Sequence, residues 1–133
     1  MRYLLFQPLY RKICELDPKL LGGKFGNLQT NDVILMHERL KHVKSTHFED
    51  YKLFSKSLKT VIVDPDYVIE DKTHRGTVFY VKRLSNSNVN VVVRLALSSD
   101  KNGRKNSIMT FFRIRESNLA KMINKNSVIY KKV

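Results

Sequence analysis

Three of the four histidines in this chain lie within eleven residues, HERLKHVKSTH, at positions 37–47. Histidine is the side chain whose unperturbed pKa lies closest to neutral pH, so such a cluster is a candidate for proton transfer. His42 and His47 are five residues apart, which places them roughly 140° apart around a continuous helix. A helix that ended between them would allow both imidazoles to face one cleft.

The residues between these histidines predict such an end. Thr46 and Glu49 match a capping box, with Thr46 as the N-cap of a second helix and Glu49 at its third position. His47 would then lie in the first turn, where the helix dipole disfavours the imidazolium. One neutral and one charged histidine would serve as general base and general acid near neutral pH. A polar, solvated helix surface is the alternative interpretation.

A zinc site at the histidines is a weaker hypothesis. It would need further ligands at a recognisable spacing, and only Cys14 and His74 remain, neither of them in a ligand pattern. His37, directly after an apolar run, is most simply a polar residue at a helix start. We therefore predict no metal site and no cofactor.

A basic residue interrupts a segment that is otherwise typical of a strand, VNVVVRLAL at 89–97. Arg94 shares one face of this strand with Asn90, Val92 and Ala96, and the other face is entirely apolar. An arginine among small residues is suited to bidentate binding of a phosphate. An exposed sheet face with a solvated arginine is the alternative.

The charge of the chain is uneven. The sequence has 25 Lys and Arg against 12 Asp and Glu, a net charge of +13. Residues 1–71 carry a net charge of +1, and residues 72–133 carry +12. The second half is therefore predicted to bind a polyanion, with nucleic acid favoured over a membrane because the basic residues lie on strand-like segments. A generally lysine-rich composition is the alternative.

The length of 133 residues predicts a single domain, 1–133. Cys14 is the only cysteine, so an internal disulfide is excluded and a reducing compartment is compatible with the chain. We read Cys14 as a structural thiol on a strand. We find no signal peptide and no apolar run of the ~18 residues that a membrane span needs. These observations predict a soluble, cytoplasmic protein, which could also be one domain of a longer polypeptide.

The order of the expected elements predicts an α+β fold, with N-terminal helices packed on a mostly antiparallel sheet of four to five strands. The apolar periodicity predicts helices at 37–45 and 48–62 and a further helix from 116. The expected strands are 33–36, 67–71, 77–84, 89–97 and 107–115, with 127–133 as a last strand or a tail.

Six segments in this order, HVKSTH, VIVDPDYVIED, VFYVKRL, VVVRL, NSIMTFF and VIYKK, resemble the phage-borne nuclease families of the barnase–EndoU–colicin–RelE superfold, known as PBECR domains. The resemblance covers about 11–133. Its most specific part is His42-x4-His47 followed by the turn Asp64-Pro65-Asp66.

The resemblance implies a metal-independent ribonuclease site on the open face of the sheet. The RNA 2′-hydroxyl would attack the neighbouring phosphorus and leave a 2′,3′-cyclic phosphate, with two histidines transferring the protons. The implied catalytic residues are His42, His47, Lys82, Arg94 and Thr110, and the expected substrate-binding residues are Arg83, Lys105, Ser107 and Arg113. The hydroxyls of Ser107 and Thr110 would orient a phosphate oxygen, although both residues are also ordinary in strands and turns.

The implied partners are RNA, with tRNA as one candidate, and an acidic inhibitor or immunity protein. The expected location is the cytoplasm of the host or of a target cell. A rival interpretation is a non-catalytic nucleic-acid-binding module that uses the same basic sheet. A more remote one is a structural phage protein that binds packaged DNA.

Overall fold

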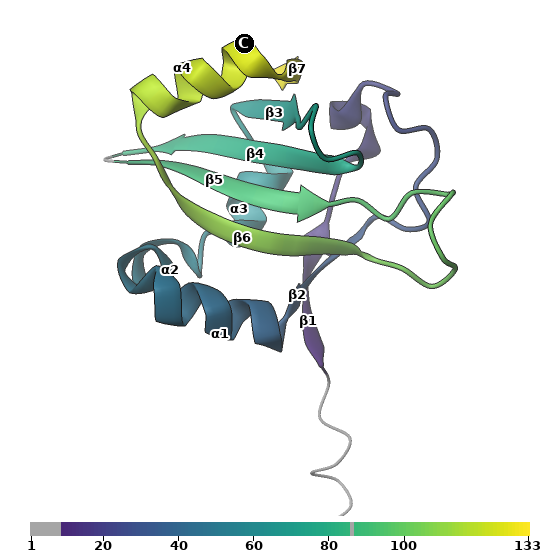
Figure 1. Ribbon diagram of the computed structural model, residues 1–133, viewed down its shortest axis with the longest axis horizontal. Helices are drawn as coiled ribbons and strands as arrows, with labels where there is room; N and C mark the ends of the chain where they lie inside the picture. Colours follow the sequence, from purple (N-terminus) through teal and green to yellow (C-terminus); the bar gives the residue numbers. More distant parts are fainter. Residues whose placement is uncertain (1–8, 86) are drawn as a thin grey trace, which may run out of the picture.

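A computed structural model describes residues 9–85 and 87–133 of the chain (Figure 1). Within these residues the fold is α+β, as predicted, with one sheet of seven strands and four α-helices. The strands are β1 Tyr10–Glu15, β2 Asp32–Met36, β3 Tyr67–Glu70, β4 Thr77–Leu84, β5 Ser87–Arg94, β6 Asn106–Ile114 and β7 Ser127–Lys131. The helices are α1 His37–Thr46, α2 Phe48–Phe54, α3 Leu58–Val63 and α4 Glu116–Lys125.

The strand order in the sheet is β1-β2-β6-β5-β4-β3-β7. The strands β3 to β6 form an antiparallel meander, and β2 pairs in parallel with β6. The prediction of four to five strands is wrong, because the two edge segments, β1 and β7, also pair with the sheet and bring the number to seven. Cys14 does lie on a strand, and its burial raises the pKa of its thiol to about 11.

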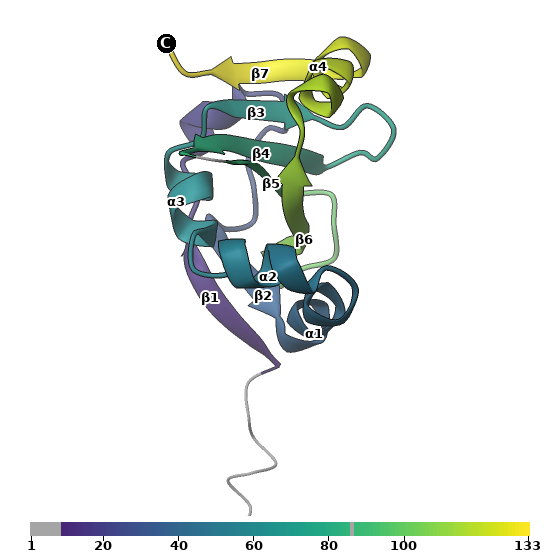
Figure 2. The same cartoon turned by 90° about the vertical axis from the view of Figure 1, so that its left-hand side faces the viewer.

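One face of the sheet, which we call the core face, carries the main hydrophobic core. On β5 the residues Val89, Val91 and Val93 are fully buried there, as the alternation in the sequence predicts. Residues of α1, α2 and α3 join the same cluster, among them Val43 and Phe54. Figure 2 shows α3 and α4 on opposite sides of the sheet.

The other face, the open face, is covered mainly at one end. Helix α4 packs Leu119 against Ile69, Val81 and Ile114 in a small second cluster. The rest of this face, over β4, β5 and β6, looks toward the reader in Figure 1. The α4 helix therefore leaves much of one sheet face free of helices, which is where a site could lie.

The helices between β2 and β3 differ from the prediction. The expected helix 48–62 is two helices, α2 and α3, separated at residues 55–57, where two of the three residues are serines with low helix propensity. The break lets α3 turn and bury Leu58, Val61 and Ile62 against the sheet.

The predicted capping box is also wrong. Thr46 is the last residue of α1, and its Oγ1 donates backward to the carbonyl of His42 at 2.7 Å instead of capping α2. His47 stands at the junction, where its N–H donates to the carbonyl of Val43 and its carbonyl accepts from the N–H of Tyr51. The two helices therefore meet at a single residue.

Candidate functional site

Three of the predicted site residues lie together on the open face. Arg94 on β5 pairs with Ser107 on β6, and the next position on the same face of β5, Val92, pairs with Thr110. Since side chains two residues apart in a strand share a face, Arg94, Ser107 and Thr110 form a row of polar groups across two neighbouring strands.

A β-bulge makes this row possible. Ser107 and Thr110 are three residues apart, a spacing that would place them on opposite faces of a regular strand. The register of β5 and β6 shifts between Val92 and Val93, so that Val92 faces Thr110 and Val93 faces Ile108. Met109 is the extra residue, and its insertion returns Thr110 to the open face.

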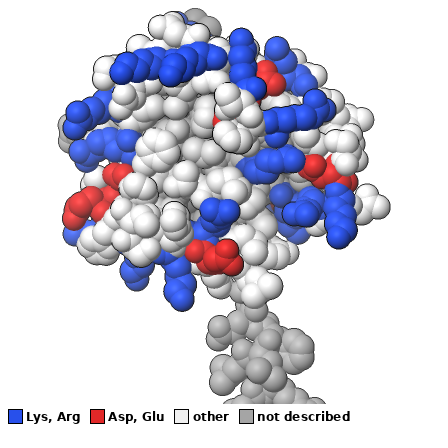
Figure 3. Space-filling model, in the orientation of Figure 1, with Lys and Arg blue, Asp and Glu red and all other residues white. Residues whose placement is uncertain are grey.

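A pocket of about 650 Å³ lies at one end of this row. Arg94, Lys105 and Ser107, all predicted site residues, line it together with the start of α1 and the loop between β5 and β6. Its basic residues are Arg39, Arg94, Lys101, Arg104 and Lys105, and its acidic residues are Glu38 and Asp100. In Figure 3, drawn in the orientation of Figure 1, the centre of the surface is largely uncharged, and Lys and Arg side chains lie around it with fewer Asp and Glu side chains among them.

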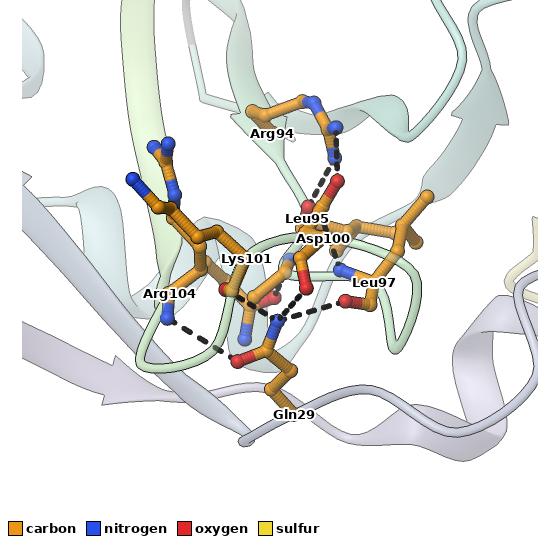
Figure 4. Close-up of polar contacts among 9 residues, drawn as sticks. Gln29, Arg94, Leu95, Leu97, Asp100, Lys101 and Arg104 are labelled. Carbon is orange, nitrogen blue, oxygen red and sulfur yellow. Dashed lines mark hydrogen bonds and ion pairs between the residues drawn. The ribbon is translucent and has the colours of Figure 1, made fainter.

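Gln29 organises the loop that forms one wall of the pocket (Figure 4). Its Nε2 donates to the carbonyls of Leu97, Asp100 and Lys101 at 2.9, 3.2 and 3.0 Å. Its Oε1 accepts from the backbone N–H groups of Gly103 and Arg104 at 3.0 and 3.2 Å. One side chain therefore contacts five backbone groups of the loop, with the two hydrogens of Nε2 shared among three carbonyls, and holds the basic residues of the loop in place.

Asn106 fixes the other end of the loop. It is fully buried, and its Oδ1 accepts from the N–H of Ala96 at 2.8 Å. Its Nδ2 donates to the carbonyls of Thr30 and Asp32. Because each of these polar atoms has a partner, the burial of Asn106 links β6 to β2 at the base of the pocket without leaving an unsatisfied amide.

Arg94 is held by the loop as well as facing the pocket. Its Nη2 lies 3.1 Å from Oδ1 of Asp100, and its Nη1 donates to the carbonyl of Leu95. Its guanidinium lies close to Gly76, where a Cβ would meet Cζ at 2.9 Å and where φ is +81°. Hydrogen bonds from Leu97 N–H and Arg94 lower the pKa of Asp100. Arg94 therefore has a structural role that the sequence did not reveal.

The histidines of the cluster do not line this pocket. His42 on α1 and His47 at the α1–α2 junction are both exposed. However, Glu38 and Arg39 of α1 do line it, and His42 follows them by four and three residues. At 3.6 residues per turn, His42 therefore lies between them around the helix and one turn further along the same side.

Lys82 lies away from Arg94. In β4 its pairing partner is Val89 of the core face, whereas Arg94 pairs with Thr77 on the open face. Its Nζ donates to the backbone carbonyl and to Oδ2 of Asp64 at 2.7 and 3.1 Å. Lys132 also binds Asp64, and these two amines lower the pKa of the Asp64 carboxyl. The expectation that Lys82 and Arg94 serve one site is therefore corrected, because they lie on opposite faces.

The two remaining arginines also lie outside the pocket. Arg83 forms a bidentate ion pair with Glu116, with two N–O distances of 3.0 Å, and so fastens the start of α4 to β4. Arg113 pairs with Val89 in the register and therefore belongs to the core-face side of β6, where it is exposed. Neither is placed to bind a substrate in the pocket.

Comparison with known proteins adds no relative. No protein-family model matches the sequence, and neither a curated protein nor a solved structure matches it. In residues 9–85 and 87–133, no helix is long and apolar enough to cross a membrane. The same residues contain no group of three or more His, Cys, Asp or Glu side chains that could hold a metal ion.

The structure adds several residues to those suggested by the sequence, and four of them are informative. Glu38 and Arg39 line the pocket, and Gln29 and Asn106 hold its loop. Glu38 and Arg39 belong to the histidine segment, so their spacing from His42 was a usable signal. Nothing in the sequence near Gln29 points to a loop some seventy residues later, because that contact depends on the tertiary fold.

Proposed function

We propose that the protein binds RNA on the open face and cleaves it without a metal ion, by attack of the 2′-hydroxyl on the adjacent phosphorus. The observation that carries this proposal is the row of Arg94, Ser107 and Thr110 next to a pocket with five basic residues. Cationic side chains in a partly enclosed site attract the phosphodiester and stabilise the charge that develops during phosphoryl transfer.

In this proposal, side chains on the side of α1 that faces the pocket transfer the protons. Glu38 lines the pocket and lies four residues before His42, so a carboxylate and an imidazole project from the same side of one helix. One group would take the 2′ proton and the other would protonate the leaving 5′ oxygen. Lys82 has no part in this mechanism because it lies on the core face.

A second candidate, RNA binding without cleavage, is favoured by a different observation. The guanidinium of Arg94 is already bound by Asp100 and by the Leu95 carbonyl. In addition, within residues 9–85 and 87–133 no hydrogen bond orients the ring of His42 or of His47. General acids and bases need a fixed position, so a purely electrostatic surface would also fit the site.

Cleavage of RNA by the purified protein in EDTA separates the two candidates. We expect a 2′,3′-cyclic phosphate product and no cleavage of the matching DNA, which lacks the 2′-hydroxyl. His42→Ala should lower the cleavage rate by about 10²–10⁴, the usual contribution of a general acid or base. His37→Ala, an exposed histidine of the same helix, is the matched control and should retain the wild-type rate.

Two further variants identify the second proton-transfer group. A loss in Glu38→Gln comparable to that in His42→Ala would assign it to Glu38, and a comparable loss in His47→Ala would assign it to His47. RNA that is bound but stays intact in EDTA would overturn the nuclease proposal and leave the binding module.

A further inference from the structure

A second basic pocket lies beside β1, away from the site described above. Its volume is about 380 Å³, and it is formed by β1 and by the segment that joins α2 to α3 and begins α3. Ile13 and Leu58 give it an apolar floor, and Arg11, Lys56 and Lys59 are exposed at its rim. The proposed nuclease mechanism does not use this pocket.

The charges around this second pocket are all of one sign. Its lining contains no acidic residue. Lys12, which also lines it, is bound to Asp32 and Glu15 at 3.1 and 3.5 Å. By contrast, Arg11, Lys56 and Lys59 form no ion pair within residues 9–85 and 87–133, and the other residues, 1–8 and 86, include no Asp or Glu. Three uncompensated cations around one hollow favour an anionic ligand.

The two pockets both adjoin β1. Tyr10 lines the first pocket and Arg11, the next residue of β1, lines the second. Tyr10 pairs with Met36, which also lines the first pocket, whereas Arg11 pairs with Leu35 of the core face, so β1 lies between the pockets at these two residues. Because β1 is an edge strand of the sheet, a flexible polyanion can pass around its outer side and reach both.

We propose that the second pocket binds a backbone phosphate of the same RNA strand whose scissile phosphate lies in the first pocket. This inference rests on the proposed function, since it assigns an additional subsite to that substrate. Arg11 would bind the phosphate through its planar guanidinium, and Lys56 and Lys59 would add point charges. The protein should then prefer RNA long enough to pass around β1.

The test compares two triple variants with equal charge. The first, Arg11→Ala/Lys56→Ala/Lys59→Ala, removes the rim of the second pocket. The control, Arg115→Ala/Lys121→Ala/Lys125→Ala, removes one arginine and two lysines that are exposed at α4, outside both pockets. Binding of a single-stranded 20-nucleotide RNA and a tetranucleotide is measured at several salt concentrations, together with cleavage of both.

For the 20-nucleotide RNA, we expect the first triple variant to lose about tenfold or more in affinity. The slope of log K against log salt should become shallower by about 0.7, which is the contribution of one phosphate contact on a single strand. Binding and cleavage of the tetranucleotide should be unchanged. The difference in affinity between the long and the short RNA can be measured even if no RNA is cleaved. This test of the second pocket is therefore independent of the nuclease proposal.

Three results would overturn this subsite. An equal loss in the α4 control would show that only net charge matters. An equal loss for the tetranucleotide would show that the residues act on the first pocket or on the fold. Inorganic phosphate that raises the melting temperature of the wild type but not of the triple variant, without any dependence on RNA length, would identify a site for free phosphate instead.

Discussion

Arg94 binds the loop between β5 and β6 and, in the proposed function, would also bind a phosphate of the RNA. The Asp100 carboxylate and the Leu95 carbonyl hold its guanidinium in place, and the remaining N–H groups are available to a phosphate in the pocket. A side chain that is held before the substrate arrives loses little freedom on binding it. In the proposed reaction, this ion pair would hold Arg94 in position for the scissile phosphate, and it also ties β5 to the loop that contains Asp100.

Substitution at this pair separates the two roles. We expect Arg94→Lys to lower single-turnover cleavage by about 10², because lysine lacks the bidentate fork and one preorganised donor is lost. Asp100→Asn keeps the arginine but weakens the contact that orients it, so it should lower the melting temperature and lower the cleavage rate by less than Arg94→Lys does. The measurements are single-turnover kinetics and thermal unfolding of both variants. Equal losses of rate in the two variants would mark Arg94 as a loop anchor only.

At the scale of elements, the order of helices and strands along the chain was predictable from the sequence. The contacts between elements that are far apart in the sequence were not. The β-branched run of β5 and its alternation identified the strand and its buried face from local sequence alone. The capping box failed because a threonine at a helix end can bond backward to a carbonyl as readily as forward. The bulge at Met109 left no local signature, and without it Ser107 and Thr110 could not be placed together.

The loop between β5 and β6 supplies a prediction at this scale. Gln29→Ala removes the partner of five loop groups and should cost about 1–3 kcal/mol, since the Leu97 and Asp100 carbonyls lose a donor while remaining partly buried. Amide hydrogen exchange should accelerate most at Gly103 and Arg104, whose N–H groups bind Oε1.

Asn102→Ala is the matched control, because Asn102 is exposed in the same loop. It should leave both stability and exchange unchanged. Rapid cleavage by Gln29→Ala together with fast exchange at Gly103 would contradict a role of the ordered loop in the proposed reaction.

The whole molecule combines a strongly basic chain with carboxylates most of which form ion pairs or accept hydrogen bonds. The pKa values of Asp32, Asp64, Asp71, Asp100 and Glu116 all lie below the usual range, chiefly because of hydrogen bonds from neighbouring lysines, arginines and backbone or hydroxyl groups. With so few acidic residues in the chain, each of these contacts offsets part of the repulsion among the basic residues.

The sign of the pH dependence follows from these shifts. A carboxyl whose folded pKa is lowered binds its proton less readily in the folded state, so it stabilises the fold above its unfolded pKa of about 4. That contribution disappears as the pH falls through the lower folded values. We expect the urea midpoint to stay flat with respect to these groups from pH 7 to pH 5 and to fall steadily below pH 4.

Asp64→Asn tests this expectation, because Asp64 is bound by both Lys82 and Lys132. Its urea midpoint should be lower than that of the wild type at pH 7 and closer to it at pH 3. A constant difference across this range would show that the charge on Asp64 does not contribute to the dependence.

The extra residue in β6 has a consequence for how this sequence can change over evolutionary time. A loop such as 98–105 can gain or lose a residue with little effect on the strands that flank it. Loss of Met109 would instead reverse the two faces of β6 on one side of the bulge. Apolar side chains there would turn toward water, or polar side chains would turn into the core. We therefore expect the number of residues in the loop to vary among related sequences and the number of residues in β6 to stay constant.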